Sequence, residues 1–261
     1  MTYAPFDLSG KVALVTGGNR GIGLGMARAL AASNASVAIW GRKDAANKAA
    51  VEALSGLGTG EIKSWAVDVA DEQAVIDATV DTVAAMGRID SCIANAGVGF
   101  GAPSFVDMDT ATWRKNMAVN LDGAFWTLRE SIKHMTARAK AGDPGGSVVG
   151  IASLAAIEGA ARNEAYAATK GGLISMLKAI AVEYARYGIR ANAILPGWIA
   201  TDMTQGAQGN DAFETKVIPR VPARRWGQPE DFGGLAVYLT SDASSYHSGT
   251  TLVVDGGYSI F

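Results

Sequence analysis

Residues 11–32 place a short apolar run, a glycine-rich turn and a helix-forming run in direct succession. The apolar run at 11–16 is typical of a buried strand, and residues 24–32 have the composition of a helix. Between them, glycines let the backbone approach a ligand closely, while the helix start offers free N–H groups and the positive end of its dipole. This order predicts a phosphate-binding turn. The candidates for cofactor contact are Gly17, Asn19, Arg20, Gly21, Ile22 and Gly23.

The spacing of these glycines departs from the strict G-x-G-x-x-G fingerprint. Met26 stands where a third glycine is expected after Gly21 and Gly23. A glycine-rich turn is also compatible with simple chain reversal. Its place between a strand and a helix favours the nucleotide site.

The same alternation of apolar runs and helix-forming runs continues along the chain. Further strands are expected at 36–40, 61–67, 90–94, 147–152, 189–195 and 250–254, and helices at 48–57, 71–86, 109–139, 164–183 and 229–239. This order predicts an α/β fold with a doubly wound parallel sheet that is covered by helices on both faces. A length of 261 residues fits a single domain of this kind.

The residues after the second strand bear on the choice of cofactor. Folds that prefer NAD place an acidic residue there, where it binds the 2′-hydroxyl of the ribose. Gly41 occupies that place, and Arg42 and Lys43 follow it. Arg42, helped by Arg20 or Lys43, is suited to hold a 2′-phosphate through charge-assisted hydrogen bonds, which favours NADP over NAD. The alternative is that these cations are solvated surface charges, and Asp44 is expected to cap the next helix.

Other predicted strand ends carry small or polar residues, and ligands of parallel sheets bind beyond the carboxyl ends of the strands. Asp68 and Val69 are placed to border an adenine ring. Small residues after the fourth strand let the backbone and a cofactor come close. The further candidates are Asn95, Ala96 and Gly97 after the fourth strand, and Pro196, Gly197, Ile199 and Thr201 after the sixth.

Residues 201–222 are polar, contain glycine and show little periodicity. A segment of this kind after the sixth strand is expected to form a mobile lid over the substrate. The alternative is disordered decoration of the surface.

Ser153, Tyr166 and Lys170 are the candidates for chemistry. Ser153 follows the predicted strand at 147–152, while Tyr166 and Lys170 lie four residues apart on a predicted helix, so their side chains share one face. A fixed ammonium near Tyr166 is expected to lower the pKa of its phenol from about 10 toward 7, which corresponds to about 4 kcal/mol. Tyr166 is then suited to act as a general acid or base. Taken alone, this spacing is also compatible with an exposed ring over an aliphatic stem.

Asn120 lies inside the predicted helix at 109–139, with Gly123 three residues later. An asparagine inside a helix usually points outward and costs a little stability. If it faces the site, its amide or a local distortion of the helix would hold a water between Lys170 and solvent.

The overall composition limits the classes of partner. Hydrophobic residues make up 49% of the chain, the formal net charge is −2 and the pI is about 5.7, without a basic stripe, so a nucleic-acid partner is not expected. The only cysteine, Cys92, lies in an apolar run and is expected to fill the core. His134 and His247 are far apart and lack cysteine neighbours, which gives no support to a metal site.

Two further patterns concern location and assembly. No apolar run approaches the roughly 18 residues of a membrane span, and residues 1–10 lack the pattern of a secretory signal, so a soluble, cytoplasmic protein is expected. The predicted helical stretches at 113–128 and 164–183 carry apolar residues on nearly every face, more than one sheet can cover. This surplus predicts a homo-oligomer.

Together these motifs resemble the short-chain dehydrogenase/reductase family, in its 3-oxoacyl reductase-like and alcohol dehydrogenase-like branch, over essentially the whole chain. The resemblance rests on Thr16-Gly17-x-x-x-Gly21-x-Gly23, Asn95-Ala96-Gly97, Asn120, Ser153, Tyr166-x-x-x-Lys170 and Pro196-Gly197, in the family's order and at its usual separations. The family's glycine pattern accounts for the incomplete fingerprint. The resemblance implies a Rossmann-type fold and a homotetramer. Gly150 departs from the asparagine of many relatives, outside the residues expected to act chemically.

The resemblance also implies a catalytic tetrad. Tyr166 would exchange a proton with the substrate oxygen, and Ser153 would hydrogen-bond that oxygen. Lys170 would lower the pKa of the tyrosine and bind the nicotinamide ribose, and Asn120 would hold a water of a proton relay. Hydride would pass between C4 of the nicotinamide and the carbonyl carbon.

The substrate is expected to be a ketone or a secondary alcohol, such as a cyclic ketone or a 3-oxoacyl group. A mostly apolar wall is expected from Val98, Phe100, Leu154, Ala155, Ile157 and Trp198, together with residues 201–222. Two alternatives to an NADP-dependent enzyme stay open: an NAD-dependent alcohol dehydrogenase, and a non-catalytic nucleotide-sensing protein on the same fold. The presence of Tyr166 together with Lys170 argues against the sensor.

Overall fold

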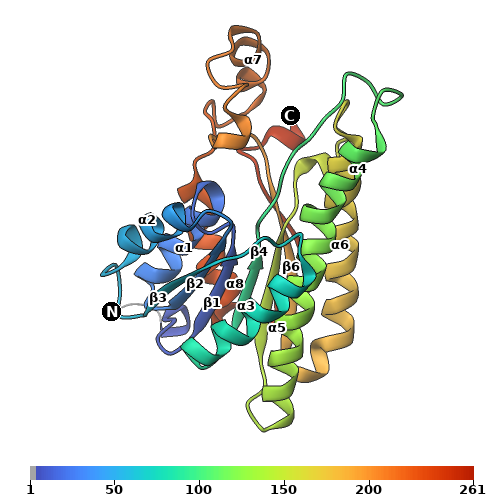
Figure 1. The fold of residues 1–261 in the computed structure, drawn as a ribbon. Coiled ribbons are helices and arrows are strands. Elements are labelled where there is room, and N and C mark those ends of the chain that lie inside the picture. Colours follow the sequence, from blue (N-terminus) through green and yellow to red (C-terminus); the bar gives the residue numbers. More distant parts are fainter. Residues whose placement is uncertain (1–3) are drawn as a thin grey trace.

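The computed structural model describes residues 4–261, apart from the side chain of Ala212. Residues 1–3, part of the segment expected to lack a secretory signal, lie outside the described residues. Parallel strands form one sheet in the order β3-β2-β1-β4-β5-β6-β7 (Figure 1). The strands are β1 (Val12–Thr16), β2 (Ser36–Gly41), β3 (Ile62–Ala66), β4 (Ser91–Ala94), β5 (Gly146–Ile151), β6 (Ile189–Pro196) and β7 (Thr251–Val254). The predicted parallel α/β sheet is confirmed.

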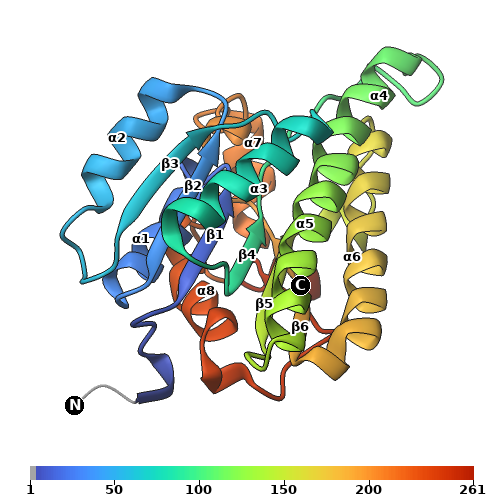
Figure 2. The same cartoon turned by 60° about the horizontal axis from the view of Figure 1, so that its bottom comes forward.

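Helices cover both faces of the sheet (Figure 2). One face carries α1 (Gly21–Ala32), α2 (Asp44–Leu54) and α8 (Gly233–Thr240). The other carries α3 (Glu72–Met86), α5 (Gly123–Lys140) and α6 (Glu164–Tyr184), with α4 (Thr110–Met117) leading into α5. The short helix α7 (Asp211–Lys216) stands beyond the carboxyl ends of the strands (Figure 1). The doubly wound arrangement follows from these two helical layers.

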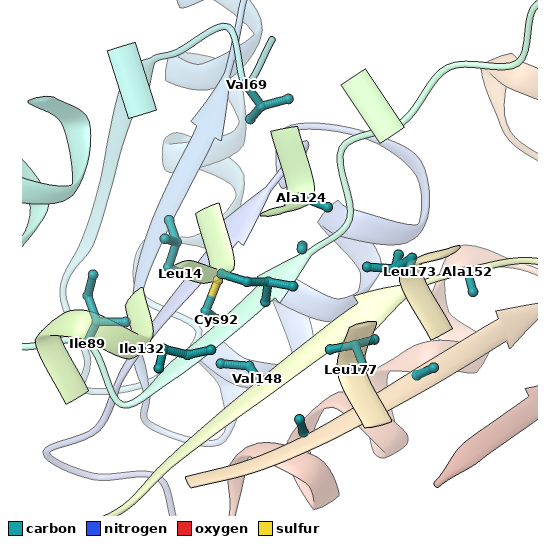
Figure 3. Packing of buried hydrophobic residues seen from close by; sticks show 14 of the residues in the cluster. Leu14, Val69, Ile89, Cys92, Ala124, Ile132, Val148, Ala152, Leu173 and Leu177 are labelled. Carbon is teal, nitrogen blue, oxygen red and sulfur yellow. The ribbon is translucent and has the colours of Figure 1, made fainter. Parts of the chain in front are cut away.

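Each face of the sheet has its own apolar core. Successive side chains of a strand point to opposite faces, so Leu14 of β1 packs with α3, α5 and α6, while Ala13 and Val15 pack with α1 and α8. Cys92 of β4 is fully buried near Leu14 and Val148 (Figure 3), and burial raises the pKa of its thiol to about 12. The prediction that Cys92 fills the core is confirmed.

Two helices begin earlier than the sequence pattern indicates. The helix α1 begins at Gly21, because the last part of the glycine turn already forms its first turn. The helix α2 begins at Asp44, and the prediction that Asp44 caps it is wrong. Lys43 is the residue at the cap position, and Asp44 lies within the helix, where it pairs with Lys48 at 2.7 Å.

The single helix expected between the fourth and fifth strands is interrupted by a π-helical turn, Ala118–Asp122, which separates α4 from α5. Asn120 lies in this turn, and its side chain is directed at the backbone of Val98. Gly123 begins α5 so close to Val69 that a β-carbon would lie 2.7 Å from the Val69 carbonyl oxygen. Such single π-helical turns occur inside α-helices, frequently at functional sites.

Residues 201–222 form short helical turns around α7. One 3₁₀ turn, Asp202–Thr204, begins the segment, and another, Ile218–Arg220, lies near its end. Phe213 of α7 packs edge-to-face on Trp198, with ring centres 4.7 Å apart. These elements disfavour the alternative of disordered decoration.

Within residues 4–261, no helix combines the length and the apolar character that crossing a membrane requires. In that same range, leaving Ala212 aside, no three or more His, Cys, Asp or Glu side chains are grouped so that they suit a metal ion.

Candidate active site

The glycine turn after β1 lies at the carboxyl edge of the sheet. Gly17 and Gly21 have φ angles of +63° and +51°, which residues with a β-carbon rarely adopt. A β-carbon on Gly23 would lie 2.3 Å from the carbonyl oxygen of Gly17. These glycines are therefore required by the turn, and the first turn of α1 offers backbone N–H groups to an anion.

Asn95 braces this turn from the end of β4. Its Nδ2 donates hydrogen bonds to the carbonyl oxygens of Thr16 at 2.9 Å and of Gly17 at 3.3 Å. The hydroxyl of Thr16 in turn accepts hydrogen bonds from the backbone N–H groups of Asn95 and Ala96, both at 3.0 Å. The structure brings these predicted residues together, and the side chain of Asn95 is used by the turn itself.

Asn47, a buried residue of α2, is a member of the site that no sequence motif indicated. Its Oδ1 accepts a hydrogen bond from Asn19 at 2.6 Å. Its Nδ2 donates to the carbonyl oxygens of Gly41 at 2.8 Å and of Trp65 at 3.0 Å. A β-carbon on Gly41 would lie 2.3 Å from Asn19 Nδ2 and 2.5 Å from Asn47 Oδ1. An acidic residue at Gly41, as in NAD-preferring folds, would therefore have to displace these two amides.

The cations near the end of β2 have different environments. Arg42 and Lys43 are exposed, and within residues 4–261 neither side chain takes part in an ion pair. Arg20 instead pairs with Asp202 at 3.2 Å, which links the glycine turn to residues 201–222. Arg42 and Lys43 are thus accessible to an anion, whereas Arg20 already has a partner.

Asp68 and Val69 follow β3 as predicted, but they differ in burial. Asp68 is exposed, and its Oδ1 accepts a hydrogen bond from Ala70 N at 3.1 Å. The side chain of Val69 is buried in the core that includes Ala124 (Figure 3). Contact with an adenine ring would therefore come from Asp68 and from the backbone of Val69.

The predicted residues after β6 also divide into supporting and accessible ones. A β-carbon on Gly197 would lie 2.6 Å from Cβ of Asp255, and Ile199 is buried, so both serve close packing. Thr201 lies against the glycine turn, since its Cγ2 is 3.3 Å from the position of a β-carbon on Gly21. Thr201 is therefore placed beside the glycine turn.

Ser153, Tyr166 and Lys170 come together beside the end of β5. Ser153 has an extended backbone, and its Oγ accepts a hydrogen bond from Ala155 N at 3.2 Å. Lys170 Nζ lies 5.5 Å from the centre of the Tyr166 ring, on the same face of α6. It also donates a hydrogen bond to the carbonyl oxygen of Ile151 at 2.7 Å. The expected convergence of a hydroxyl, a phenol and an ammonium group is present.

The electrostatics of this group differ from the expectation. Burial raises the pKa of Tyr166, and a hydrogen bond with Ser153 opposes that effect. Burial also lowers the pKa of Lys170 to about 8. The expected lowering of the Tyr166 pKa is therefore not found in the protein alone, because removal of both groups from water favours their neutral forms.

Asn120 points at the protein rather than outward. Its Oδ1 accepts a hydrogen bond from Val98 N, and its Nδ2 donates one to Val98 O, both at 2.8 Å. Its Nδ2 also donates a hydrogen bond to the hydroxyl oxygen of Thr169 at 3.3 Å. The amide is engaged in this way, so of the two expected ways to hold a water, by the amide or by a local distortion of the helix, the π-helical turn fits the second, which stays a prediction.

Asn116 lies one helical turn before Asn120. It pairs with the backbone of Phe100 in the same way as Asn120 pairs with that of Val98. Its Oδ1 accepts a hydrogen bond from Phe100 N at 3.2 Å, and its Nδ2 donates one to Phe100 O at 2.9 Å. Asn116 is fully buried. The sequence signal for this residue is the spacing of two asparagines four residues apart, which was not among the predicted motifs.

The predicted apolar wall divides into exposed and buried residues. Phe100 and Ile157 are 44% and 56% exposed, whereas Leu154 is buried in the core. Trp198 packs against α7 through Phe213. Leu154 therefore supports the site from below, while Phe100 and Ile157 are accessible to a substrate.

Comparisons with known proteins agree with this arrangement. A sequence model described as Enoyl-(Acyl carrier protein) reductase matches residues 17–259. The 3-oxoacyl-(acyl-carrier-protein) reductase FabG of Chlamydia pneumoniae is 37% identical over 250 residues, which cover 96% of this chain and 97% of that protein. The gluconate 5-dehydrogenase of Gluconobacter oxydans is 35% identical over 255 residues, which cover 98% of this chain and 97% of that protein.

The fold comparison points the same way. A crystal structure of a gluconate 5-dehydrogenase from Burkholderia cenocepacia, in complex with NADP and tartrate, matches with a TM-score of 0.89 at 35% identity. The match covers 98% of this chain and 97% of that one. Sequence and fold are therefore shared over nearly the whole length.

Proposed function

Because this chain belongs to the short-chain dehydrogenase/reductase family, we propose that its site moves a hydride between NADP and a ketone or secondary alcohol. The chain is an NAD(P)-dependent oxidoreductase of that family. The observation that carries the proposal is the convergence of Ser153, Tyr166 and Lys170 at the sheet edge that also holds the glycine turn.

Tyr166 and Ser153 act on the reacting oxygen. Tyr166 gives a proton to the ketone oxygen in reduction and takes it back in oxidation. The raised pKa of Tyr166 keeps its phenol protonated at neutral pH, which suits the role of acid. Ser153 holds the same oxygen by a hydrogen bond. When bound, the nicotinamide group supplies or accepts the hydride at its C4.

Lys170 and Asn120 support that proton transfer. Below about pH 8 the ammonium of Lys170 is charged, and its charge stabilises the phenolate of Tyr166 that forms during the reaction. The hydrogens of Nζ that are not given to Ile151 suit the hydroxyls of the nicotinamide ribose. The π-helical turn at Asn120 holds the water through which protons reach solvent.

The residues at the other end of the site fit the phosphates of NADP. A β-carbon on Gly23 would collide with the carbonyl oxygen of Gly17, so this glycine allows the tight turn that presents N–H groups to the diphosphate. Arg42 with Lys43 holds the 2′-phosphate. Gly41 supplies no carboxylate at the place where NAD-preferring folds carry one, and a side chain there would displace the amides of Asn19 and Asn47, which supports NADP over NAD.

The affinities for NADPH and NADH test the cofactor assignment. Tryptophan fluorescence at one fixed salt concentration is the readout, and binding of NADPH is expected to be tighter by tenfold or more, about 1.4 kcal/mol. Equal or reversed affinities would remove the 2′-phosphate role and leave the family assignment standing.

Tyr166→Phe tests the catalytic assignment. Loss of turnover with unchanged NADPH binding is expected, because the variant keeps the ring and lacks the exchangeable proton. Unchanged turnover would contradict the mechanism. Nucleotide binding without turnover of any ketone by the natural chain would favour the nucleotide-sensing alternative.

The proposal extends to assembly and location. We propose a homotetramer located in the cytoplasm. The assembly is supported by exposed apolar side chains on three neighbouring helices, Trp113 of α4, Phe125 of α5 and Val182 of α6. Val253 is exposed on β7, at the edge of the sheet. Light scattering during gel filtration measures the number of subunits.

The chain is proposed to form one domain, 1–261, in which residues 201–222 act as the substrate lid. Exposed Met203 at the start of this segment lies over Gly99, where a β-carbon would be 3.9 Å from its sulfur. The substrates named for the relatives, a 3-oxoacyl group and gluconate, are both candidates for this space.

A further inference from the structure

Residues 97–102, here termed the strap, lead away from the end of β4. In Figure 1 the chain after β4 rises toward α4. Glycine alternates with larger residues along the strap, in the order Gly97, Val98, Gly99, Phe100, Gly101 and Ala102. In an extended chain, alternate residues point their side chains to opposite faces and their backbone groups to opposite edges.

Asparagine side chains occupy one edge of the strap. Asn120 pairs with both backbone groups of Val98, at 2.8 Å each. Asn116 pairs with both backbone groups of Phe100, at 3.2 and 2.9 Å. Two amides one helical turn apart therefore replace the neighbouring strand that a sheet would supply. They fix the strap in place without a β-ladder.

The glycines of the strap adjoin the catalytic group and the segment proposed as the lid. A β-carbon on Gly97 would lie 3.5 Å from Lys170 Nζ, and one on Gly99 would lie 3.9 Å from Met203 Sδ. The strap thus lies beside the catalytic side chains at Gly97 and beside residues 201–222 at Gly99. Because these positions carry no side chains, a molecule bound between the two would meet the backbone of the strap.

The second edge of the strap carries the N–H and C=O groups of Gly99 and Gly101. Both glycines are exposed, and no hydrogen bond within residues 4–261 uses these backbone groups. The far end of the strap is held by Arg162, whose carbonyl oxygen accepts a hydrogen bond from Ala102 N at 2.9 Å. An unpaired edge with donors and acceptors in alternation binds a partner that offers both kinds of group.

We propose that this free edge binds the hydroxyl groups of a polyhydroxylated ketone, and that Asn116 is the positioning residue that holds the edge in place. The proposal rests on the oxidoreductase function above and names the substrate class of the same site. A hydroxyl both donates and accepts, so neighbouring hydroxyls match the alternating C=O and N–H groups. An acyl chain would remove the same backbone groups from water without pairing them, which is unfavourable.

A pair of matched substrates tests the edge. The ketones 5-ketogluconate and 5-oxohexanoate share the carbon chain, the carboxylate and the position of the ketone, and they differ in the hydroxyls. With NADPH, kcat/KM is expected to be about 100-fold or more higher for 5-ketogluconate, because a site built around substrate hydroxyls rejects the analogue that lacks them. Fructose and acetoacetyl-coenzyme A complete the panel as a second hydroxylated ketone and a 3-oxoacyl substrate.

Asn116→Ala tests the positioning role. The variant is expected to lower kcat/KM for 5-ketogluconate about tenfold, mainly through KM, and to change 5-oxohexanoate less than about twofold. Asn192→Ala is the matched control, because Asn192 is also buried and also clamps backbone, at Thr250 N (3.1 Å) and His247 O (2.9 Å). It is expected to lose thermal stability without changing the preference between the two ketones. Asn116→Asp, which keeps the acceptor for Phe100 N–H, is expected to recover part of the preference.

The possible results of these experiments separate the substrate class, the role of Asn116 and the proposed function. If 5-oxohexanoate or acetoacetyl-coenzyme A is reduced as well as the hydroxylated ketones, the free edge does not select the substrate, and the oxidoreductase function still stands. If Asn116→Ala keeps the preference of the natural chain, Asn116 has no positioning role. If NADPH binds and no ketone of the panel is reduced, the proposed function itself fails.

Discussion

Lys170 Nζ donates a hydrogen bond of 2.7 Å to the carbonyl oxygen of Ile151, the last residue of β5. This bond joins the face of α6 that carries Tyr166 to the carboxyl edge of the sheet. It also holds the ammonium in a buried place, where the pKa of Lys170 falls to about 8. The charge of Lys170 therefore changes within the pH range in which such an enzyme is assayed.

The first prediction concerns activity against pH. In ketone reduction kcat/KM is expected to fall as pH rises through about 8, because Lys170 loses its proton there while Tyr166, whose pKa is raised, keeps its own. The pH profile of kcat/KM with NADPH measures this. Lys170→Arg is expected to move the fall to higher pH, since a guanidinium stays charged. A profile that is flat from pH 7 to about 9.5 would contradict the assignment.

The second prediction concerns stability against pH. Below about pH 8 Lys170 is buried with its charge, which opposes folding; between about 8 and 10.5 the folded chain has lost that proton and the unfolded chain retains it. The free energy of unfolding is therefore expected to gain up to about 3 kcal/mol from Lys170 over this range. Lys170→Met lacks this gain.

Urea unfolding at pH 7 and at about pH 10 measures the difference between the natural chain and Lys170→Met. Lys178→Met, which replaces an exposed lysine of the same helix, is the control and is expected to follow the natural chain. If the free energy of unfolding of Lys170→Met changed with pH as that of the natural chain does, burial of the Lys170 charge would not oppose folding.

The third prediction concerns Arg42. Arg42→Ala is expected to weaken NADPH binding about tenfold or more and NADH binding less than about twofold, because the proposed contact of the side chain is with the 2′-phosphate alone. Fluorescence titration gives both dissociation constants. Lys140→Ala, which replaces an exposed lysine at the end of α5, is the control for a general change in net charge. Equal losses for both nucleotides would show that Arg42 is a solvated surface charge.

The fourth prediction concerns Gly41. Gly41→Asp is expected not to improve NADH binding and to lower the free energy of unfolding by about 1 kcal/mol, because the new β-carbon breaks the contact between Asn19 and Asn47. Removal of the obstructing amide in Gly41→Asp/Asn19→Gly is expected to restore NADH binding relative to the single variant. Tighter NADH binding by Gly41→Asp alone would mean that the end of β2 adapts more easily than its contacts indicate.

The fifth prediction concerns the pair between Arg20 and Asp202. Their side chains are 62% and 73% exposed, so the pair contributes modestly and is screened by salt. Asp202→Asn is expected to raise the release rates of NADPH and NADH alike, by about twofold to fivefold at low salt, because the pair links the glycine turn to residues 201–222. Asp44→Asn, which breaks an exposed pair on α2, is the control. A change confined to NADPH would mean that Asp202 competes with the 2′-phosphate for Arg20.

Much of the fold could be predicted because its signals are local. The residues of β1 form a continuous buried run, and the glycines at 17, 21 and 23 mark where it turns into α1. The spacing of Tyr166 and Lys170 puts both on one face of a helix whatever surrounds it. The place of the site at the carboxyl edge follows from such signals, whereas the order of the strands in the sheet was not predicted.

The contacts that shape the site could not be predicted in the same way. Asn116, Asn120 and Asn47 all use buried amides to hold the backbone of another segment, and each partner is chosen by tertiary packing rather than by spacing. The pKa of Tyr166 is raised and not lowered for a related reason. The spacing of Tyr166 and Lys170 predicts that they are close, but it does not show how deeply they are buried. The prediction that Asp44 caps α2 was wrong, because residue propensity alone does not decide at which residue a helix starts.

The brace between Asn95 and Thr16 has a consequence for synthesis of the chain. The glycine turn is translated early, whereas the residue that holds it in shape lies 79 positions after Thr16 and comes from another strand. A nascent chain that ends within α3 thus contains every residue of the turn without its brace. If the glycine turn holds the nucleotide as proposed, its binding-competent shape arises only when β4 docks beside β1, so that cofactor can stabilise the assembled sheet but cannot guide its first half into shape.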